Sequence, residues 1–222
     1  MSISFHILDA GGRLEKFQVQ ISDSLRVGLE HIEQELSLPS IDVVVVDDPH
    51  SAIPETGVGG SAPTAHLLYI YVDPEFTDLD KTLDFEIRST LAHELHHCAR
   101  WANIGYGSTL LEAIVSEGLA DHFDIEINGG VPKLWDTAIQ REGLETLLEM
   151  AKLEFTNSDY DHAAWFYGSA KIPRWAGYSL GFKLVGDYMQ KTQKKASELV
   201  SEPASSFTTS WINYANLSLA TK

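Results

Sequence analysis

Residues 91–100, LAHELHHCAR, decide the fold, and they place three histidines, a glutamate and the only cysteine of the chain in ten positions. The stretch continues a helical pattern, because large apolar residues recur every four positions and form one face. These residues are Leu79, Leu83, Ile87, Leu91 and Leu95. Within the same pattern His93, Glu94 and His97 match His-Glu-x-x-His. We therefore expect a helix that buries one face and carries a histidine pair.

The spacing of the histidine pair suits a shared metal ion. Residues four apart on an α-helix differ by about 40° in direction and by one turn in height. The imidazoles of His93 and His97 are therefore predicted to point to the same side. Glu94 lies about 100° round from His93, where its carboxylate can reach a water on the ion without binding the ion. The pattern predicts two metal ligands and a neighbouring general base.

The helix expected next supplies a third ligand. It contains Glu117, twenty residues after His97, and Asp121 one turn further on. Two antiparallel helices joined by the short turn at 103–108 bring Glu117 back toward the histidines. His93, His97 and Glu117 then predict a zinc site that leaves a fourth position for water. Asp121 is expected to accept the second ring N–H of a ligand histidine and to fix its tautomer.

Length and composition bound the classes of protein that the chain can represent. Its 222 residues, 44% of them hydrophobic, suffice for one large domain or a domain with a small annex. It has no apolar run of about 18 residues and no secretory signal pattern, so we expect no membrane span. A single cysteine favours the reducing cytoplasm. The formal charge of −16 argues against nucleic acid as a partner.

The first part of the chain predicts an α+β arrangement. The segments at 3–8 and 15–21 alternate apolar and polar residues around DAGG, which favours a hairpin. Helical spacing follows over 24–36. Strands are expected at 41–48 and 66–74, separated by a loop rich in glycine, proline and serine.

The second part of the chain is predicted to be helical. The helix that follows residue 108 begins with Thr109 and Glu112 at capping-box spacing and ends at Asn128. Further helices are expected at about 134–154 and 174–192. A boundary near residue 130 divides the chain into an α+β catalytic lobe, 1–130, and a helical lobe, 131–222, unless the whole forms one compact domain.

These motifs resemble those of the gluzincin, or thermolysin-like, clan of zinc metallopeptidases, in which Glu-x-x-x-Asp follows the His-Glu-x-x-His helix. LAHELHH, LLEAIVSEGLADHF and WAGYSLGFKLV more narrowly resemble a bacterial family of predicted zinc-dependent proteases, known largely as a domain of unknown function. The clan resemblance covers about residues 66–125, and the narrower one about 57–190. It implies a zincin-like α+β fold: a small mixed or antiparallel N-terminal sheet, the two site helices, and a mainly helical C-terminal lobe.

The resemblance implies hydrolysis of peptide bonds with Zn²⁺ as the cofactor. Zinc makes hydroxide available near neutral pH, and Glu94 takes the proton as general base and returns it to the departing amine. The developing oxyanion needs one more donor, which in the clan is a Tyr or His from a later segment. The candidates are Tyr178, Tyr167 and His162.

Tyr178 is the favoured donor, because small residues on its helix allow a close approach to the site. These are Ala176, Gly177 and Gly181. The alternative is a tyrosine that only packs between lobes. Two neighbours of the motif are not assigned to the metal: His96 is expected to have a supporting or a surface role, and Cys98 to be a packed thiol.

The substrate implied by the resemblance is a peptide or unfolded protein. Clan members bind substrate along an exposed edge strand, for which HLLYIYV at 66–72 is the candidate. The loop GVGGSAPTA has no glutamate to capture a substrate amine, which favours an endopeptidase or oligopeptidase. Two alternatives are a zinc-binding module of the same fold without turnover, such as a chaperone-like protein, and a helical domain with a coincidental motif. The sequence does not specify the oligomeric state.

Overall fold

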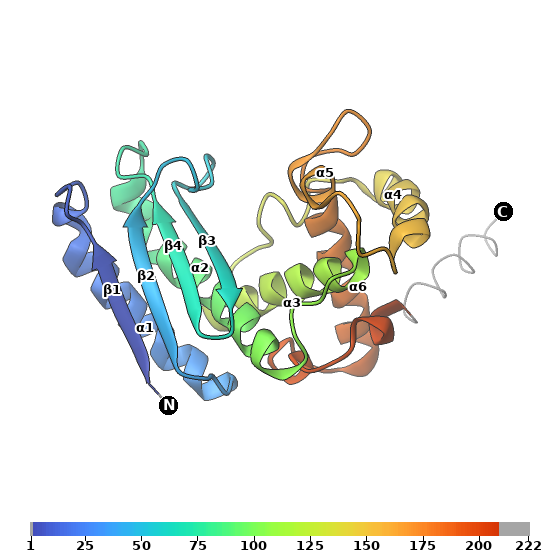
Figure 1. Cartoon of the computed structure of the whole chain (residues 1–222), viewed down its shortest axis with the longest axis horizontal. Helices are drawn as coiled ribbons and strands as arrows, with labels where there is room; N and C mark the ends of the chain where they lie inside the picture. Colours follow the sequence, from blue (N-terminus) through green and yellow to red (C-terminus); the bar gives the residue numbers. More distant parts are fainter. Residues whose placement is uncertain (1, 209–222) are drawn as a thin grey trace. The chain divides into compact units, whose positions relative to one another are not determined.

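The computed structural model describes residues 2–208 (Figure 1). Strands dominate the beginning of the chain and helices the rest. The elements in order are β1 (Ile3–Leu8), a 3₁₀ turn (Glu15–Phe17), α1 (Gln18–Glu35), β2 (Ile41–Asp47), β3 (Val58–Thr64), β4 (Leu67–Val72), α2 (Leu79–Asn103), α3 (Leu110–Asn128), α4 (Arg141–Glu154), α5 (His162–Tyr167), α6 (Ala176–Thr192) and a second 3₁₀ turn (Ser197–Leu199).

The chain forms two compact units, and α3 contributes to both. The first unit contains the chain up to residue 103 together with 124–129, and the second contains 104–123 and the chain from residue 130 onward. The expected division near residue 130 into a catalytic and a helical lobe stays a prediction, and its last residues, 209–222, lie outside the described part of the chain.

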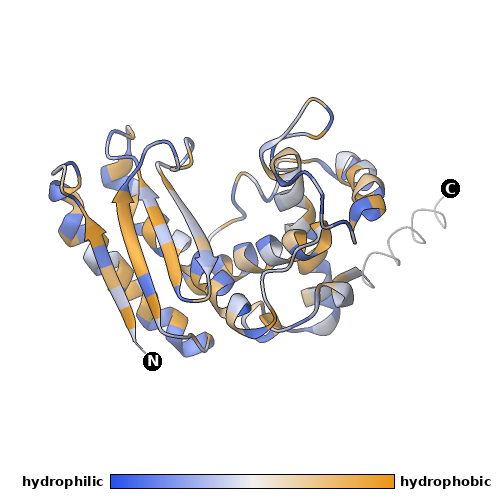
Figure 2. Ribbon diagram, viewed as in Figure 1, coloured by the Kyte–Doolittle hydropathy of each residue, from blue (hydrophilic) through white to orange (hydrophobic). Residues whose placement is uncertain are grey.

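The first unit is built on a mixed four-stranded sheet of order β1-β2-β4-β3. β1, β2 and β4 run parallel, whereas β3 pairs antiparallel with β4. Alternate residues of β4, Leu68, Ile70 and Val72, are fully buried, as a strand with one face on a core requires. α2 contacts α1, β3 and β4, and Figure 1 shows both helices behind the sheet. Figure 2 shows hydrophobic residues concentrated on β2 and β4.

The hairpin expected around DAGG is wrong. Residues 15–21 begin a 3₁₀ turn and α1 instead of a second strand, and β1 pairs with β2. Phe17, Ile21 and Leu25 are buried at intervals of four, so helical periodicity prevails over a short alternating pattern. The helix expected over 24–36 is confirmed, but it begins six residues earlier, at Gln18.

The loop expected between the two long strands is wrong in its second half. Residues 58–64 form β3, which is one of the two edge strands, so β4 lies inside the sheet and HLLYIYV is not an edge strand. The glycines that made this segment look like a loop lie at positions where close contacts leave no room for a side chain. A Cβ at Gly59 would lie 2.7 Å from the carbonyl oxygen of Ser51, and one at Gly60 would lie 2.7 Å from Glu94 Oε1.

The second unit brings α3 and α6 into backbone contact. A Cβ at Gly118 would lie 2.3 Å from the carbonyl carbon and oxygen of Gly181, and one at Gly181 would lie 2.2 Å from the carbonyl oxygen of Ile114. α6 confirms the helix expected at 174–192, and α4 confirms the later part of the helix expected at 134–154. α5 was not expected. Within residues 2–208, each helix is too short or too polar to cross a membrane.

The contact between α3 and α6 predicts a large effect of one methyl group. Gly181→Ala places a Cβ against backbone that cannot rotate away, so we expect a loss of about 1–3 kcal/mol in the free energy of unfolding. Gly11→Ala is the matched control, because nothing lies within 4 Å of its added Cβ. Urea unfolding of both variants measures the difference, and equal midpoints contradict the close packing of the two helices.

Candidate metal centre

The histidine pair converges on one point. His93 and His97 lie on α2, and their Nε2 atoms are 3.0 Å apart. The rings meet edge to face with centroids 4.7 Å apart, and His97 is buried. Two ligand nitrogens on one tetrahedral zinc ion are separated by about 3.3 Å, given the usual zinc–nitrogen bond length. The pair therefore has the separation that a shared zinc ion requires.

Glu117, on α3, completes a group of three ligands. His93, His97 and Glu117 each offer one ligand atom, and these atoms lie within 4.8 Å of one another. Among residues 2–208 this is the only such group of histidine, cysteine, aspartate and glutamate side chains. Two imidazole nitrogens and one carboxylate oxygen are a donor set that catalytic zinc sites use. The residues present thus fit a zinc ion.

Glu94 lies on α2, like the two histidines, and next to the edge strand β3. Its side chain is buried, with 5% of its surface exposed, although it is a carboxylate. Gly60 of β3 faces it so closely that an added Cβ would also lie 2.7 Å from Glu94 Cγ. The absence of a side chain at Gly60 therefore makes the room in which the Glu94 carboxylate lies.

Polar contacts fix the register of α2 and α3 within the first unit. Ser89 donates to Asp124 Oδ2 at 2.5 Å, and Asn128 donates to the other oxygen of Asp124 at 2.9 Å. Arg88 donates to Asn128 Oδ1 at 3.4 Å. Ser89 and Asp124 are both buried. From this contact the numbering rises along α2 toward His93 and falls along α3 toward Glu117, so the helices run antiparallel.

Tyr106 is a residue of the site that sequence reasoning missed. It lies in the turn between α2 and α3, and its hydroxyl donates a hydrogen bond to Glu117 Oε1. Burial and the nearby charge of Glu117 raise the pKa of Tyr106 well above its usual value, so the hydroxyl keeps its proton. The signal in the sequence was the pair of glycines around it: Gly105 and Gly107 have φ values of +83° and +99°.

Asp121 lies one turn after Glu117 and is buried. The indole Nε1–H of Trp135 donates to Asp121 Oδ1 at 3.3 Å. The expected hydrogen bond from a ligand histidine to Asp121 stays a prediction.

The three candidates for the oxyanion donor have different surroundings. The ring of Tyr178 packs edge to face on Phe166 at 5.0 Å between centroids, and it lies 6.4 Å from the ring of Trp135. Tyr167 is 64% exposed. His162 begins α5, and its Nδ1 lies 3.0 Å from the hydroxyl of Tyr160. The choice among the three stays a prediction.

The charge of Glu117 reaches two further side chains of the second unit. Burial raises the pKa of Tyr160, and the charge of Glu117 raises it further. Burial lowers the pKa of His162, although the charges of Glu117 and Asp161 oppose this shift. Both groups are therefore neutral hydrogen-bonding side chains near neutral pH, within electrostatic range of the proposed ligand.

His96 and Cys98, the other two residues of LAHELHHCAR considered above, are packed inside the first unit. Cys98 is fully buried and its thiol lies 3.6 Å from the carbonyl oxygen of Thr64. Burial, helped by the charge of Glu94, raises the pKa of Cys98 to about 12, so the expected packed thiol is confirmed. His96 is also fully buried, which makes the surface role considered for it wrong.

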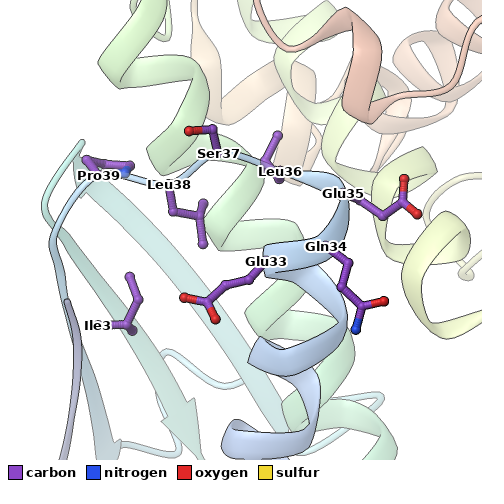
Figure 3. A pocket seen from close by; sticks show the side chains of 8 residues that line it. All are labelled: Ile3, Glu33, Gln34, Glu35, Leu36, Ser37, Leu38 and Pro39. Atoms are coloured by element: carbon purple, nitrogen blue, oxygen red, sulfur yellow. The ribbon is translucent and has the colours of Figure 1, made fainter. Parts of the chain in front are cut away.

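A separate pocket lies at the C-terminal end of α1, in the first unit (Figure 3). Its volume is about 420 Å³, and it contains none of the residues assigned to the metal site. The lining residues are Ile3, Glu33, Gln34, Glu35, Leu36, Ser37, Leu38 and Pro39. Figure 3 shows the Glu33 side chain turned toward Ile3, whereas Glu35 points away.

One comparison with known proteins, the match to a family model, agrees with a zinc site. A family model described as "Predicted Zn-dependent protease (DUF2268)" matches residues 21–209. "Uncharacterized protein YjaZ" of Bacillus subtilis (strain 168) is 28% identical over 145 residues, or 62% of this chain. The match spans 56% of that relative's own length. No solved structure matches the chain significantly.

The buried contact between α2 and α3 yields a stability prediction. Ser89→Ala removes a donor from the buried carboxylate of Asp124, so we expect a loss of about 1–3 kcal/mol in the free energy of unfolding. Ser24→Ala is the matched control, because Ser24 donates at 2.8 Å to Asp84, whose carboxylate is exposed and can bind water instead. Chemical denaturation compares the two variants, and an equal loss in both contradicts a special role for Asp124.

Proposed function

Because the chain belongs to the family of predicted zinc-dependent proteases, we propose that it is a zinc metallopeptidase of the gluzincin type. The observation that carries this proposal is the convergence of one ligand atom each from His93, His97 and Glu117. Glu94, one residue after the first ligand, is the proposed general base. Membership of the gluzincin clan and the zincin-like fold are part of the proposal.

The proposed reaction is hydrolysis of a peptide bond by water. A bound zinc ion supplies Lewis acidity toward the water and the substrate carbonyl. The Glu94 carboxylate takes a proton from the attacking water and delivers it to the nitrogen of the departing amine. Burial of Glu94 supports this role, because it keeps bulk water from competing for the proton that is transferred.

The oxyanion that develops on the carbonyl needs a hydrogen-bond donor from the protein. Tyr178 is the proposed donor, with His162 and Tyr167 as the alternatives. The contact between Gly118 and Gly181 supports Tyr178, because it brings α6 against α3 one residue from Glu117. His162 keeps support from its neutral ring and from its place within the field of Glu117.

The proposed substrate is a peptide or unfolded protein in an extended conformation. Within residues 2–208, β3 pairs with β4 only, so its other edge can form main-chain hydrogen bonds with a peptide. This strand lies against Glu94, which supports it as the substrate strand in place of the segment 66–72. Its sequence has no glutamate for a substrate amine, which supports endopeptidase or oligopeptidase activity. The buried single thiol suits the cytoplasm as the place of action.

Metal binding and cleavage are separated by two substitutions. We expect one zinc ion per chain in the wild type, and loss of that ion in His93→Ala. Glu94→Gln is expected to keep zinc and to lower the rate of cleavage of a peptide library about 10²- to 10⁴-fold, because it removes only the base. Metal analysis and mass spectrometry of the products measure both effects.

The outcomes distinguish the rival functions. Stoichiometric zinc without cleavage in the wild type favours a binding or chaperone-like module. Chains that lack zinc, with His93→Ala unchanged, indicate a coincidental motif. A Glu94→Gln variant that cleaves at the wild-type rate excludes the proposed base.

The edge strand gives a second test of the same proposal. Gly60→Ala places a methyl group against Glu94 and Thr90, so the carboxylate must move. We expect cleavage to fall by about 10²-fold, the usual cost of displacing a catalytic group by 1 Å, while zinc binding persists. Gly11→Ala, with open space around its Cβ, should cleave normally. Equal rates in the two variants would show that Gly60 does not position the base.

A further inference from the structure

The hydrogen bond from Tyr106 engages only one of the two carboxylate oxygens of Glu117, the proposed ligand. The phenol donates to Oε1, and both residues belong to the second unit. When one oxygen of a carboxylate accepts a hydrogen bond, the group is held in one orientation, and its other oxygen is available to a metal ion. Hydrogen bonds of this kind to ligating carboxylates commonly tune the affinity of a metal site.

The turn that carries Tyr106 is built to hold it. Gly105 and Gly107 on either side adopt positive φ values, which only glycine adopts without strain. A Cβ at Gly107 would lie 2.3 Å from Glu112 Cβ, so the turn lies directly on the first turn of α3. The carboxylate of Glu112 in turn accepts hydrogen bonds at 2.9 Å from the backbone N–H groups of Ser108 and Thr109. The chain that directly follows Tyr106 is therefore fixed relative to the helix that carries Glu117.

We infer that Tyr106 is a positioning residue that orients Glu117 and restricts it to binding the metal ion through one oxygen. The inference rests on the proposed function, because it takes Glu117 as a zinc ligand. Tyr106 is not assigned to the chemistry of cleavage. Its effect is on the affinity of the site, since without the hydrogen bond the carboxylate rotates among orientations of which few suit the ion.

The test measures zinc affinity by competition with a chelating dye and does not depend on activity. Tyr106→Phe keeps the ring and removes only the hydroxyl, and we expect the dissociation constant for zinc to rise about 10- to 100-fold. Tyr188→Phe is the matched control, because the Tyr188 hydroxyl also hydrogen-bonds to a glutamate of the same unit, Glu202. The control should bind zinc as tightly as the wild type.

Repeating the measurement in a Glu117→Gln variant distinguishes an effect of Tyr106 on the orientation of Glu117 from a general effect on the fold. In Glu117→Gln, whose affinity is already reduced, adding Tyr106→Phe should change the dissociation constant less than twofold. The melting temperature of the metal-free Tyr106→Phe chain should lie close to that of the wild type. Unchanged zinc affinity in the single variant, or the same loss in both backgrounds, overturns the inference while zinc binding by the wild type still stands. A wild-type chain that binds no zinc overturns the proposed function and this inference together.

Discussion

The hydrogen bond from Ser89 to Asp124 is the contact on which the geometry of the site depends. Histidines four apart on one helix find each other through helical geometry alone, but the third ligand comes from a different helix. Its distance from the pair depends on how far α3 is shifted along α2, and a shift of one residue moves a side chain by about 1.5 Å and turns it by about 100°. A buried carboxylate tolerates few such shifts, because each one separates it from its donors.

Glycine plays the complementary part at each of the two site carboxylates. Gly60 leaves room for Glu94 beside β3, and Gly118, the neighbour of Glu117, lets the backbone of α6 approach α3. Gly118 meets the backbone of Gly181, whereas the space beside Gly60 is occupied by the side chains of Thr90 and Glu94. The polar residues of the site therefore owe their placement to residues that carry no chemistry themselves.

The sequence predicted those features that depend on local periodicity. The spacing of His93 and His97, the capping box at Thr109 and the buried strand β2 follow from residues within one turn or one strand, and the structure contains each of them. β3 was missed because its glycines are required by close contacts with residues outside the strand, whereas a glycine-rich composition by itself predicts a loop. The spurious hairpin arose from a window too short to separate a period of two from one of 3.6.

The contacts around Glu117 were beyond the sequence for a different reason. Tyr106 precedes Glu117 by eleven residues across a turn, and Tyr160 and His162 follow it by more than forty. No periodicity relates such positions, so only the folded chain reveals that they share one electrostatic neighbourhood.

That neighbourhood has a consistent charge state. The raised pKa values of the two tyrosines keep their hydroxyls protonated, and the lowered pKa of His162 keeps its ring uncharged near neutral pH. A cation at any of these positions would repel a metal ion, and an anion would repel the oxyanion of a substrate. Neutral donors avoid both penalties. The second unit thus places neutral groups in the electrostatic field of Glu117, and one of them, Tyr106, donates a hydrogen bond to it, which leaves the negative charge of the carboxylate to a cation.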